Sequence, residues 1–274
     1  MPPRKRFGQH WLHCDQTLDT IVQTAQLSPS DVVLEIGPGT GNLTARLLPR
    51  VQSLVIVEID RHLCAKLRQK FSSARHLHLI EGDILHTDLT SFAVVPHKVV
   101  ANIPYNITGL ILEKLLGTIA RPVSQWQTIV LLVQQEIAER LTAQPHHKHK
   151  AYGALSVRAQ YLAECEYICD VPARAFYPSP QVTSAVVRLS PRPPTQPAHD
   201  PQWLHQLISL GFSNRRKMLY NNLDCVIERS QLSQILRNLG INPQARAEEL
   251  SVAQWVELAN ATVLLRSPVA GAWK

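Results

Sequence analysis

A glycine-rich segment that could bring the backbone close to a bound ligand runs from Glu35 to Gly41 and reads Glu-Ile-Gly-Pro-Gly-Thr-Gly. Glycine permits sharp turns and has no Cβ to keep a ligand away, so Gly37 and Gly39 are the expected points of closest approach. Loops of this kind also bind dinucleotides, and some are plain turns between a strand and a helix. Taken alone, the segment indicates only a nucleotide-like cofactor.

Two carboxylates come at the ends of the next two apolar runs. Glu58 lies 21 positions after Gly37, where a carboxylate can accept both ribose hydroxyls of a nucleoside. Asp60 is a nearby competitor, although its position better suits the N-cap of a following helix. Asp83 could accept a hydrogen bond from an adenine amine, and its alternative is a turn or cap residue. Together with the glycines, these acids favour S-adenosylmethionine over NAD.

The four residues Asn102 to Tyr105 read Asn-Ile-Pro-Tyr and follow the next apolar run, where a hydride-transfer enzyme would need an acid–base group. The exocyclic amine of adenine is a poor nucleophile because its lone pair is delocalised into the ring. Acceptors aimed at its hydrogens favour a pyramidal nitrogen and stabilise the developing positive charge. The Asn102 side chain and the carbonyl of Ile103 or Pro104 could supply them. Tyr105 offers a face on which the base can stack.

No strong general base is needed, since a methylated, positively charged amine loses its proton readily. An adenine inside a duplex cannot reach such a pocket, so the target must be unpaired or flipped out. Phe176 lies in the rigid segment Phe-Tyr-Pro-Ser-Pro-Gln-Val. Its ring could stack on the other face of the base. Tyr177 is a rival for this role, and ordinary packing is the alternative for both.

The elements that must position these residues alternate between strands and helices. Apolar runs predict strands over 32–36, 54–57, 77–80, 98–101 and 128–133. Two further strands over 168–171 and 182–189 could form an antiparallel pair. Helical spacing predicts helices over 15–27, 42–48, 61–71, 107–116, 134–143 and 153–163. This alternation predicts a Rossmann-like α/β fold with a parallel sheet covered on both faces. The chemically interesting residues then fall at the carboxyl ends of the strands, where open α/β sheets bind ligands.

A proline-rich stretch divides the chain. Five prolines stand between Pro191 and Pro201, and because they cannot sustain a helix or a central strand, they predict a linker. Helical patterns follow over 202–213, 216–224, 231–239 and 252–265. We therefore expect a methyltransferase domain over residues 1–190 and a small all-helical domain over residues 191–274.

The composition narrows the partners. The 274-residue chain has a net charge of +7, which suits a polyanion, and the basic triplets Arg4–Arg6 and Arg215–Lys217 could contact phosphates or form solvated faces. Five cysteines without a C-x-x-C pair indicate reduced thiols in the cytoplasm. No apolar run is long enough for a membrane helix. The His/Lys run 146–150 lacks ligand spacing, so we expect no metal site.

In this combination and order, the motifs resemble the ribosomal RNA adenine dimethylase family, specifically its small-subunit (KsgA) type. The resemblance is carried by Arg4–Leu12, Glu35–Gly41, Val57–Asp60, Gly82–Asp83, Asn102–Tyr105, Phe176–Ser184 and Phe212–Leu219. It implies a Rossmann-like S-adenosylmethionine methyltransferase with a helical C-terminal domain that contacts RNA. It also implies N6 dimethylation of two adjacent adenosines in the 3′-terminal hairpin loop of small-subunit (16S) ribosomal RNA, with a role in small-subunit biogenesis.

The resemblance also assigns residues and partners. Cofactor contacts fall on His10, Leu12, Gly37, Glu58, Asp83 and Asn102, and the target-base pocket on Asn102, Pro104, Tyr105 and Phe176. The family usually has Asn where this chain has His10, which is bulkier and can gain a proton, so we expect pH-sensitive cofactor binding. The implied partners are small-subunit ribosomal RNA and an immature small subunit, bound by a monomer.

Three other functions compete with this interpretation. A large-subunit ribosomal RNA adenine methylase would share most motifs, although Arg215–Lys217 and the proline-rich junction favour the small-subunit type. A ribosome-assembly or nucleic-acid-binding factor could retain the fold without catalysis, but the intact Asn102–Tyr105 and Gly37–Gly39 segments argue against this. An NAD oxidoreductase is the most distant alternative.

Overall fold

The computed structural model describes residues 9–146 and 151–265. The described residues form two compact units. The first, here called the sheet unit, comprises the residues up to 117, residues 123–138 and residues 165–191. The second, here called the helical unit, comprises residues 118–122, residues 139–164 and the residues from 192 onward. The chain therefore passes between the units several times, and residues 139–164, placed by the sequence before the proline-rich junction, belong with the C-terminal helices.

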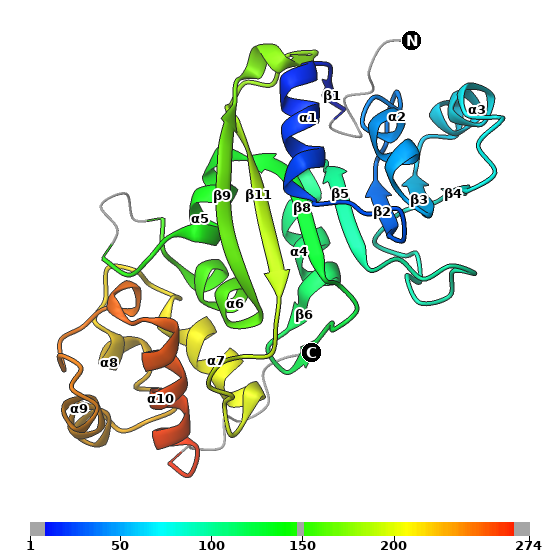
Figure 1. The fold of residues 1–274 in the computed structure, drawn as a ribbon. Coiled ribbons are helices and arrows are strands. Elements are labelled where there is room, and N and C mark those ends of the chain that lie inside the picture. Colours follow the sequence, from blue (N-terminus) through cyan, green and yellow to red (C-terminus); the bar gives the residue numbers. More distant parts are fainter. Residues whose placement is uncertain (1–8, 147–150, 266–274) are drawn as a thin grey trace. The chain divides into compact units, whose positions relative to one another are not determined.

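A seven-stranded sheet forms the centre of the sheet unit (Figure 1). Its strands, in spatial order, are β4 (Leu77–Glu81), β3 (Ser53–Glu58), β2 (Val32–Ile36), β5 (Lys98–Asn102), β8 (Thr128–Gln134), β11 (Ser184–Pro191) and β9 (Ala163–Val171). The first five run parallel, as predicted, whereas β11 pairs antiparallel with β8. The sheet is thus mixed, because β11 is reached through β9 and a loop rather than through a crossover helix.

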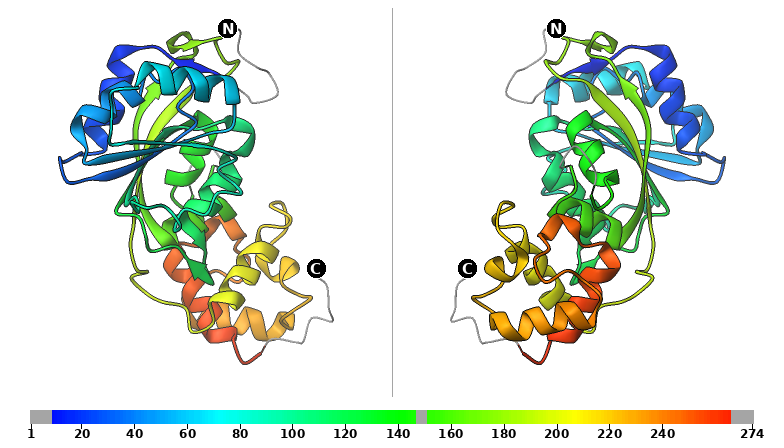
Figure 2. Two further views of the ribbon diagram at one scale, coloured as in Figure 1. Left: turned by 90° about the vertical axis from the view of Figure 1, so that its right-hand side faces the viewer. Right: turned by 90° about the vertical axis from the view of Figure 1, so that its left-hand side faces the viewer.

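Burial explains why the central strands read as continuous apolar runs. Every residue of β2 is buried, as are the five central residues of β8. Figures 1 and 2 show α1 (Asp15–Thr24), α2 (Thr44–Leu47) and α3 (Arg61–Lys70) on one face of the sheet, with α4 (Thr108–Leu116) and α5 (Gln135–Thr142) on the other. A strand covered on both faces has no position for polar alternation.

The ends of these helices follow local chemistry. Asp60 is the N-cap of α3 and accepts from the backbone N–H of His62 at 3.0 Å, which confirms its predicted capping role. The helix predicted over 42–48 is shorter, since α2 gives way to a 3₁₀ turn over Leu48–Arg50 that contains Pro49. A proline near a helix end removes one backbone donor and favours such a transition.

The sequence patterns did not predict several strands of two residues. β1 (Trp11–Leu12) pairs antiparallel with β10 (Phe176–Tyr177), and β6 (Gly117–Thr118) and β7 (Arg121–Pro122) form another small sheet. Two residues are too few to show an alternating pattern. The first of these pairs matters for function, since it ties the start of the chain to the segment that contains Phe176.

The helical unit contains α6 (Ala154–Leu162), α7 (Pro201–Gly211), α8 (Leu219–Asn222), α9 (Arg229–Asn238) and α10 (Val252–Thr262). α10 packs against α6, α7 and α9, and the fully buried Trp255 of α10 lies in the core of the unit. Asp200 caps α7 by accepting from two backbone N–H groups, directly before Pro201 in the first helical position. The stretch between Pro191 and Asp200 contains no helix or strand, in agreement with its proline content.

Candidate active site

A cavity of about 350 Å³ opens at the carboxyl ends of β2, β3 and β5. These strands surround the point where the strand order reverses, since β2 pairs with β3 on one side and with β5 on the other. The cavity collects nine of the ten predicted site residues: His10, Leu12, Gly37, Gly39, Glu58, Asp83, Asn102, Pro104 and Tyr105. Side chains separated by up to 95 positions in the sequence therefore converge on one site.

The glycine loop adopts conformations that side chains disfavour. Gly37, Gly39 and Gly41 have φ angles of +65°, +58° and +76°. A Cβ on Gly39 would lie only 3.0 Å from Cδ1 of Trp11, and a Cβ on Gly41 would lie 2.8 Å from the ring of Phe71. Both the backbone turn and the close packing of neighbouring rings require glycine at these positions.

Glu58 is held as an oriented acceptor. Its Oε2 accepts from the backbone N–H of Gly39 at 3.1 Å, and its Oε1 accepts from the N–H of Asp60 at 2.9 Å. Burial raises the pKa of the Glu58 carboxyl, while these hydrogen bonds oppose the rise. Each carboxylate oxygen can accept more than one hydrogen bond. The side chain therefore retains capacity for the paired hydroxyls of a ribose.

Asp83 lies one loop further along the same edge of the sheet. Its Oδ1 accepts from the N–H of Leu85 at 2.9 Å, and Nδ1 of His86 lies 3.1 Å from its Oδ2. The N–H of Gly82 donates to the carbonyl of Glu58 at 2.9 Å, which joins the two carboxylate-bearing loops. Ile59 and Ile84, which directly follow the two acids, also line the cavity and provide apolar walls suited to a planar base.

A hydrogen bond to His10 determines how the side-chain amide of Asn102 is oriented. Its Nδ2 donates to the backbone carbonyl of His10 at 3.1 Å. Since a carbonyl only accepts hydrogen bonds, the amide nitrogen must face His10 and the amide oxygen is left to accept from another group. The Pro104 carbonyl accepts from Ile107 N–H and from the Thr108 hydroxyl, so it is already engaged at the start of α4.

Tyr105 is fixed at both ends of its side chain. Its hydroxyl hydrogen-bonds the buried Ser184 at the start of β11. Its ring lies against the imidazole of His10, with centroids 5.8 Å apart and planes 18° apart. Burial raises the pKa of the Tyr105 hydroxyl. The phenol is therefore a rigid, neutral aromatic surface rather than an acid or base. Ser184 lies in the motif segment Phe176–Ser184, but only the structure reveals its contact with Tyr105.

The N-terminal strand completes the cavity wall. His10 Nδ1 lies 2.7 Å from the carbonyl of Pro178, so this nitrogen must carry the proton that is donated. Asn42 Nδ2 donates to the carbonyl of Leu12 at 2.9 Å. Trp11 packs against Gly39, as described above. The first described residues of the chain thereby connect the glycine loop, Asn102 and the segment after β10.

Phe176 is the predicted site residue that the structure does not bring to the cavity. It is 2% exposed, lies opposite Leu12 in the β1–β10 pair and belongs to the hydrophobic core. Its neighbour Tyr177, the predicted rival, is 62% exposed. Adjacent residues of a strand point to opposite sides, so only one of the two rings can be buried. In this arrangement Phe176 is a packing residue.

Glu35 is a cavity residue that the sequence analysis did not single out. Its fully buried carboxyl accepts from the Thr44 hydroxyl at 2.6 Å. Burial, together with the nearby charge of Glu58, raises its pKa to about 8. The available signal was an acid inside the otherwise apolar run 32–36, where a charge is costly unless the site uses it.

The structure describes only some of the basic residues that were predicted to contact RNA. Arg4–Arg6 and residues 147–150 lie outside the described residues. Arg216 and Lys217 are exposed, but Nη2 of Arg215 donates to the carbonyl of Tyr152 at 2.6 Å and so also has a structural role. Within residues 9–146 and 151–265, no cluster of three or more His, Cys, Asp or Glu side chains could hold a metal ion. No helix in these ranges is long and apolar enough to span a bilayer.

Comparison with known proteins identifies the family. The family model described as ribosomal RNA adenine dimethylase matches residues 2–263. The chain belongs to the ribosomal RNA adenine dimethylase family. Relatives of this dimethylase named ribosomal RNA small subunit methyltransferase A include one from Rippkaea orientalis, 58% identical with 94% of this chain and 97% of the relative covered. Another, from Nostoc sp., is 57% identical with the same coverage.

The solved structures of two transferases have the same fold. A dimethyladenosine transferase from Plasmodium falciparum superposes with a TM-score of 0.78 at 24% identity, covering 94% of this chain and 99% of that chain. The 23S rRNA methyltransferase ErmE gives a TM-score of 0.73 at 27% identity, with 92% and 98% covered. This dimethylase is an S-adenosylmethionine-dependent methyltransferase with the α/β fold of that class, which excludes the NAD oxidoreductase.

The cavity fits that cofactor. A nucleoside requires three kinds of group, and the cavity has all of them: glycine backbone, an oriented carboxylate for the ribose, and a second carboxylate beside two isoleucines for the base. Glu35 adds a buried carboxyl to the same lining. We find no residue in the cavity that conflicts with S-adenosylmethionine.

Proposed function

We propose that this chain dimethylates N6 of two adjacent adenosines in the 3′-terminal hairpin loop of small-subunit (16S) ribosomal RNA. It acts in the cytoplasm, as a monomer, on an immature small ribosomal subunit. Eight relatives, 51–58% identical over nearly the whole chain, carry the small-subunit name, and this favours the small-subunit over the large-subunit RNA. The observation that carries the chemistry is the orientation of Asn102, whose oxygen faces away from the His10 carbonyl.

Residues at the carboxyl ends of the strands hold the cofactor. Glu58 would accept hydrogen bonds from the ribose hydroxyls, Asp83 would accept one from the adenine amine, and the glycine loop would leave room for the rest of the molecule. Leu12 of β1 and His10, which directly precedes β1, line the same cavity. When bound, S-adenosylmethionine supplies an electrophilic methyl group on a sulfonium. The residues described below act on the other reactant, the adenine.

Asn102 accepts one hydrogen of the adenine amine through its side-chain oxygen. The Ile103 carbonyl accepts the other, because the Pro104 carbonyl is engaged with Ile107 and Thr108. Two acceptors draw both hydrogens to one side, so the nitrogen lone pair is freed from the ring and directed toward the methyl group. They also stabilise the positive charge that develops on nitrogen.

Tyr105 positions the base by stacking, and Ser184 keeps the ring in place. Removal of the Asn102 acceptor should cost about 10²- to 10³-fold in rate, as removal of one hydrogen-bond donor does at an oxyanion hole. The methylated nitrogen is acidic and releases its proton to water without a side-chain base. The same arrangement then accepts the monomethylated amine, whose one remaining hydrogen still has an acceptor.

The test uses small ribosomal subunits that lack this methylation. The purified chain is incubated with them and with a labelled methyl donor, and the labelled nucleotides are mapped by mass spectrometry. We expect label on two adjacent adenosines near the 3′ end of the small-subunit RNA. Large subunits treated in the same way serve as the control. Label found only in large-subunit RNA, or in neither, would overturn the proposal.

A further inference from the structure

The end of helix α3 packs against the glycine loop, residues 37–41, from outside the cofactor cavity. A Cβ added at Gly41 would lie 2.9 Å from the Leu67 side chain and 2.8 Å from the ring of Phe71, which directly follows α3. These apolar contacts limit how far the loop can move. They have no direction, however, so they do not determine which way the peptide groups of the loop point.

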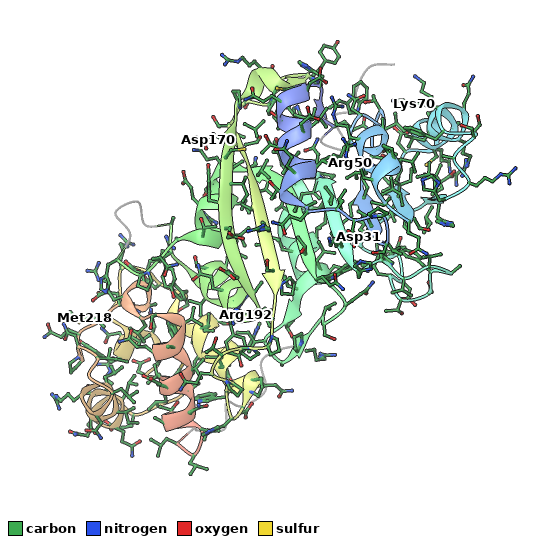
Figure 3. The ribbon with its side chains drawn as sticks, in the orientation of Figure 1. Asp31, Arg50, Lys70, Asp170, Arg192 and Met218 are labelled. Carbon is green, nitrogen blue, oxygen red and sulfur yellow. The ribbon has the colours of Figure 1, made fainter. Side chains whose placement is uncertain are left out.

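Lys70, the last residue of α3, provides the directed contacts and is labelled in Figure 3. Its Nζ donates to the carbonyl of Thr40 at 2.9 Å and to the carbonyl of Gly41 at 3.3 Å. The same ammonium lies 5.3 Å from the centre of the Phe71 ring. Within residues 9–146 and 151–265, Lys70 is the only donor to the Thr40 carbonyl, whereas the Gly41 carbonyl also accepts from the N–H of Ala45. One side chain thus binds two successive carbonyls of the loop.

The planarity of the peptide group carries this restraint to the neighbouring N–H. Because a peptide group is planar and trans, its N–H points opposite to its C=O. In the peptide between Thr40 and Gly41, the carbonyl bonds Lys70 and the N–H donates to the Pro38 carbonyl at 2.9 Å. Thr40 and Pro38 line the cofactor cavity, whereas Lys70 does not. Lys70 therefore orients backbone that faces the cavity from a position outside it.

The loop needs such a restraint because it is rich in glycine. Gly37, Gly39 and Gly41 all have positive φ angles, and glycine has more backbone conformations open to it than any other residue. A ligand binds more weakly when only a fraction of the molecules has the binding conformation, in proportion to that fraction. A contact that keeps the loop in one conformation therefore raises the affinity without touching the ligand.

We propose that Lys70 is a positioning residue for the cofactor, because its ammonium keeps the glycine loop in the conformation that receives S-adenosylmethionine. A charged donor makes stronger hydrogen bonds to carbonyls than a neutral one does, which suits it to this task. Lys70 acts through the backbone of Thr40 and Gly41. Its role concerns the cofactor alone, so it holds whichever RNA is methylated.

Titration calorimetry of S-adenosylmethionine into the full chain measures the effect on affinity. Lys70→Met keeps an unbranched side chain of similar length and removes the ammonium, and we expect the Kd to rise about tenfold, as loss of one partly exposed charged hydrogen bond does. Lys70→Arg retains a cation with several donors and should keep the Kd within about threefold of the wild type. Lys66→Met is the matched control, because Lys66 is exposed on the same helix and has no hydrogen bond in the described part of the chain. It should leave the Kd unchanged.

Amide hydrogen exchange of the cofactor-free chain, read by mass spectrometry, tests the position of the loop directly. The N–H groups of Gly39 and Gly41 are bonded to Glu58 and to the Pro38 carbonyl, so they are protected while the loop keeps its conformation. We expect Lys70→Met to speed exchange in peptides that cover residues 37–41. A lysine in the last turn of a helix also stabilises that helix through its dipole. If this were its only role, exchange would be faster in residues 61–70 and unchanged in the loop.

The outcomes separate a positioning role from a merely structural one. An unchanged Kd for Lys70→Met would overturn the proposal, as would faster exchange confined to residues 61–70 or an equal loss of affinity in Lys66→Met. Thermal unfolding verifies that each variant is folded, and if Lys70→Met is not, Lys70→Gln takes its place under the same criteria. Neither measurement needs RNA, so both remain decisive if the proposed function fails.

Discussion

Glu35 offers the sharpest test of the electrostatics around the cofactor cavity. Its carboxyl is fully buried, and burial raises its pKa from 4.5 to about 8. In the folded chain it is protonated at neutral pH, whereas in the unfolded chain it ionises above pH 4.5. Folding therefore becomes less favourable as the pH rises from 4.5 to about 8, because the unfolded state gives up a proton that the folded state keeps. Glu35→Gln should remove this penalty.

The expected size follows from that interval. At about 1.4 kcal/mol per pH unit, the gap between 4.5 and about 8 corresponds to at most roughly 5 kcal/mol. Reorientation of buried dipoles reduces it, so we expect Glu35→Gln to stabilise the chain by about 2–3 kcal/mol at pH 8 and by almost nothing at pH 5. Glutamine has the same shape and can still accept from the Thr44 hydroxyl. Most substitutions of buried residues destabilise, so the sign of the effect is diagnostic.

Thermal unfolding by calorimetry at pH 5, 6, 7 and 8 measures the effect without cofactor. For a chain of this size, 1 kcal/mol shifts the Tm by about 2–4 °C, so a gain of several degrees is expected at pH 8. Glu164→Gln is the matched control, because it neutralises an exposed carboxylate. Equal slopes of Tm against pH for the wild type and Glu35→Gln would show that Glu35 is not protonated in the folded chain, and the reasoning would be refuted.

Three further outcomes are expected. Asn102→Ala should lower kcat for subunit methylation about 10²- to 10³-fold, and a fall of less than tenfold would remove Asn102 from the chemistry. His10→Ala should weaken S-adenosylmethionine binding, measured calorimetrically at pH 7, about tenfold, because the cavity wall loses the hydrogen bond to the Pro178 carbonyl and the ring contact with Tyr105; an unchanged affinity would contradict the role given to the imidazole. Asp31→Asn should destabilise the chain by about 3 kcal/mol in urea unfolding at pH 7, because it leaves Lys98 buried without its carboxylate at 2.8 Å, whereas Asp31→Asn with Lys98→Met should cost less.

The contribution of Asp31 to the stability of the chain also depends on pH. Although burial opposes it, hydrogen bonds from Lys98 and His97 lower the pKa of Asp31 from 3.8 to about 2. Its contribution is therefore present above pH 4 and is lost as the pH falls toward 2. Figure 3 labels Asp31 beside the start of β2, and the Lys98 ammonium also donates to the carbonyl of Gln26 at 2.8 Å. The asparagine variant should show a flatter stability profile across that acid window.

The sequence predicted what local chemistry determines. The parallel strands, their order along the chain and the residues that follow them were readable, since apolar runs and glycines fix strand ends. Glu58, Asp83 and Asn102 were identified because each stands directly after a buried strand. An antiparallel pair over 168–171 and 182–189 could be expected, but the pairing of β11 with β8 depends on which edge of the sheet is open, and no local pattern contains that information. The membership of α6 in the helical unit also depends on long-range packing.

The errors at the site have the same origin. Phe176 and Tyr177 are adjacent aromatics, and only the two-residue pairing of β10 with β1 decides that Phe176 turns into the core. Glu35 was overlooked because it lies within a strand rather than after one. The engagement of the Pro104 carbonyl, which selects Ile103 as the second acceptor, depends on the first turn of α4. These contacts follow from the three-dimensional structure and cannot be predicted from sequence motifs.

The pairing of β1 with β10 can form only late in the synthesis of the chain. The bond from His10 to the Pro178 carbonyl joins residues 168 positions apart, and the first of them leaves the ribosome long before the second exists. At about 5–20 residues per second, the N-terminal segment waits roughly 10–30 s for its partner strand. During that interval β1 lacks its partner strand, and its neighbouring carbonyls have only Asn42 and Asn102 as partners. The β1–β10 side of the cofactor cavity can therefore be completed only after residues 176–178 have been translated.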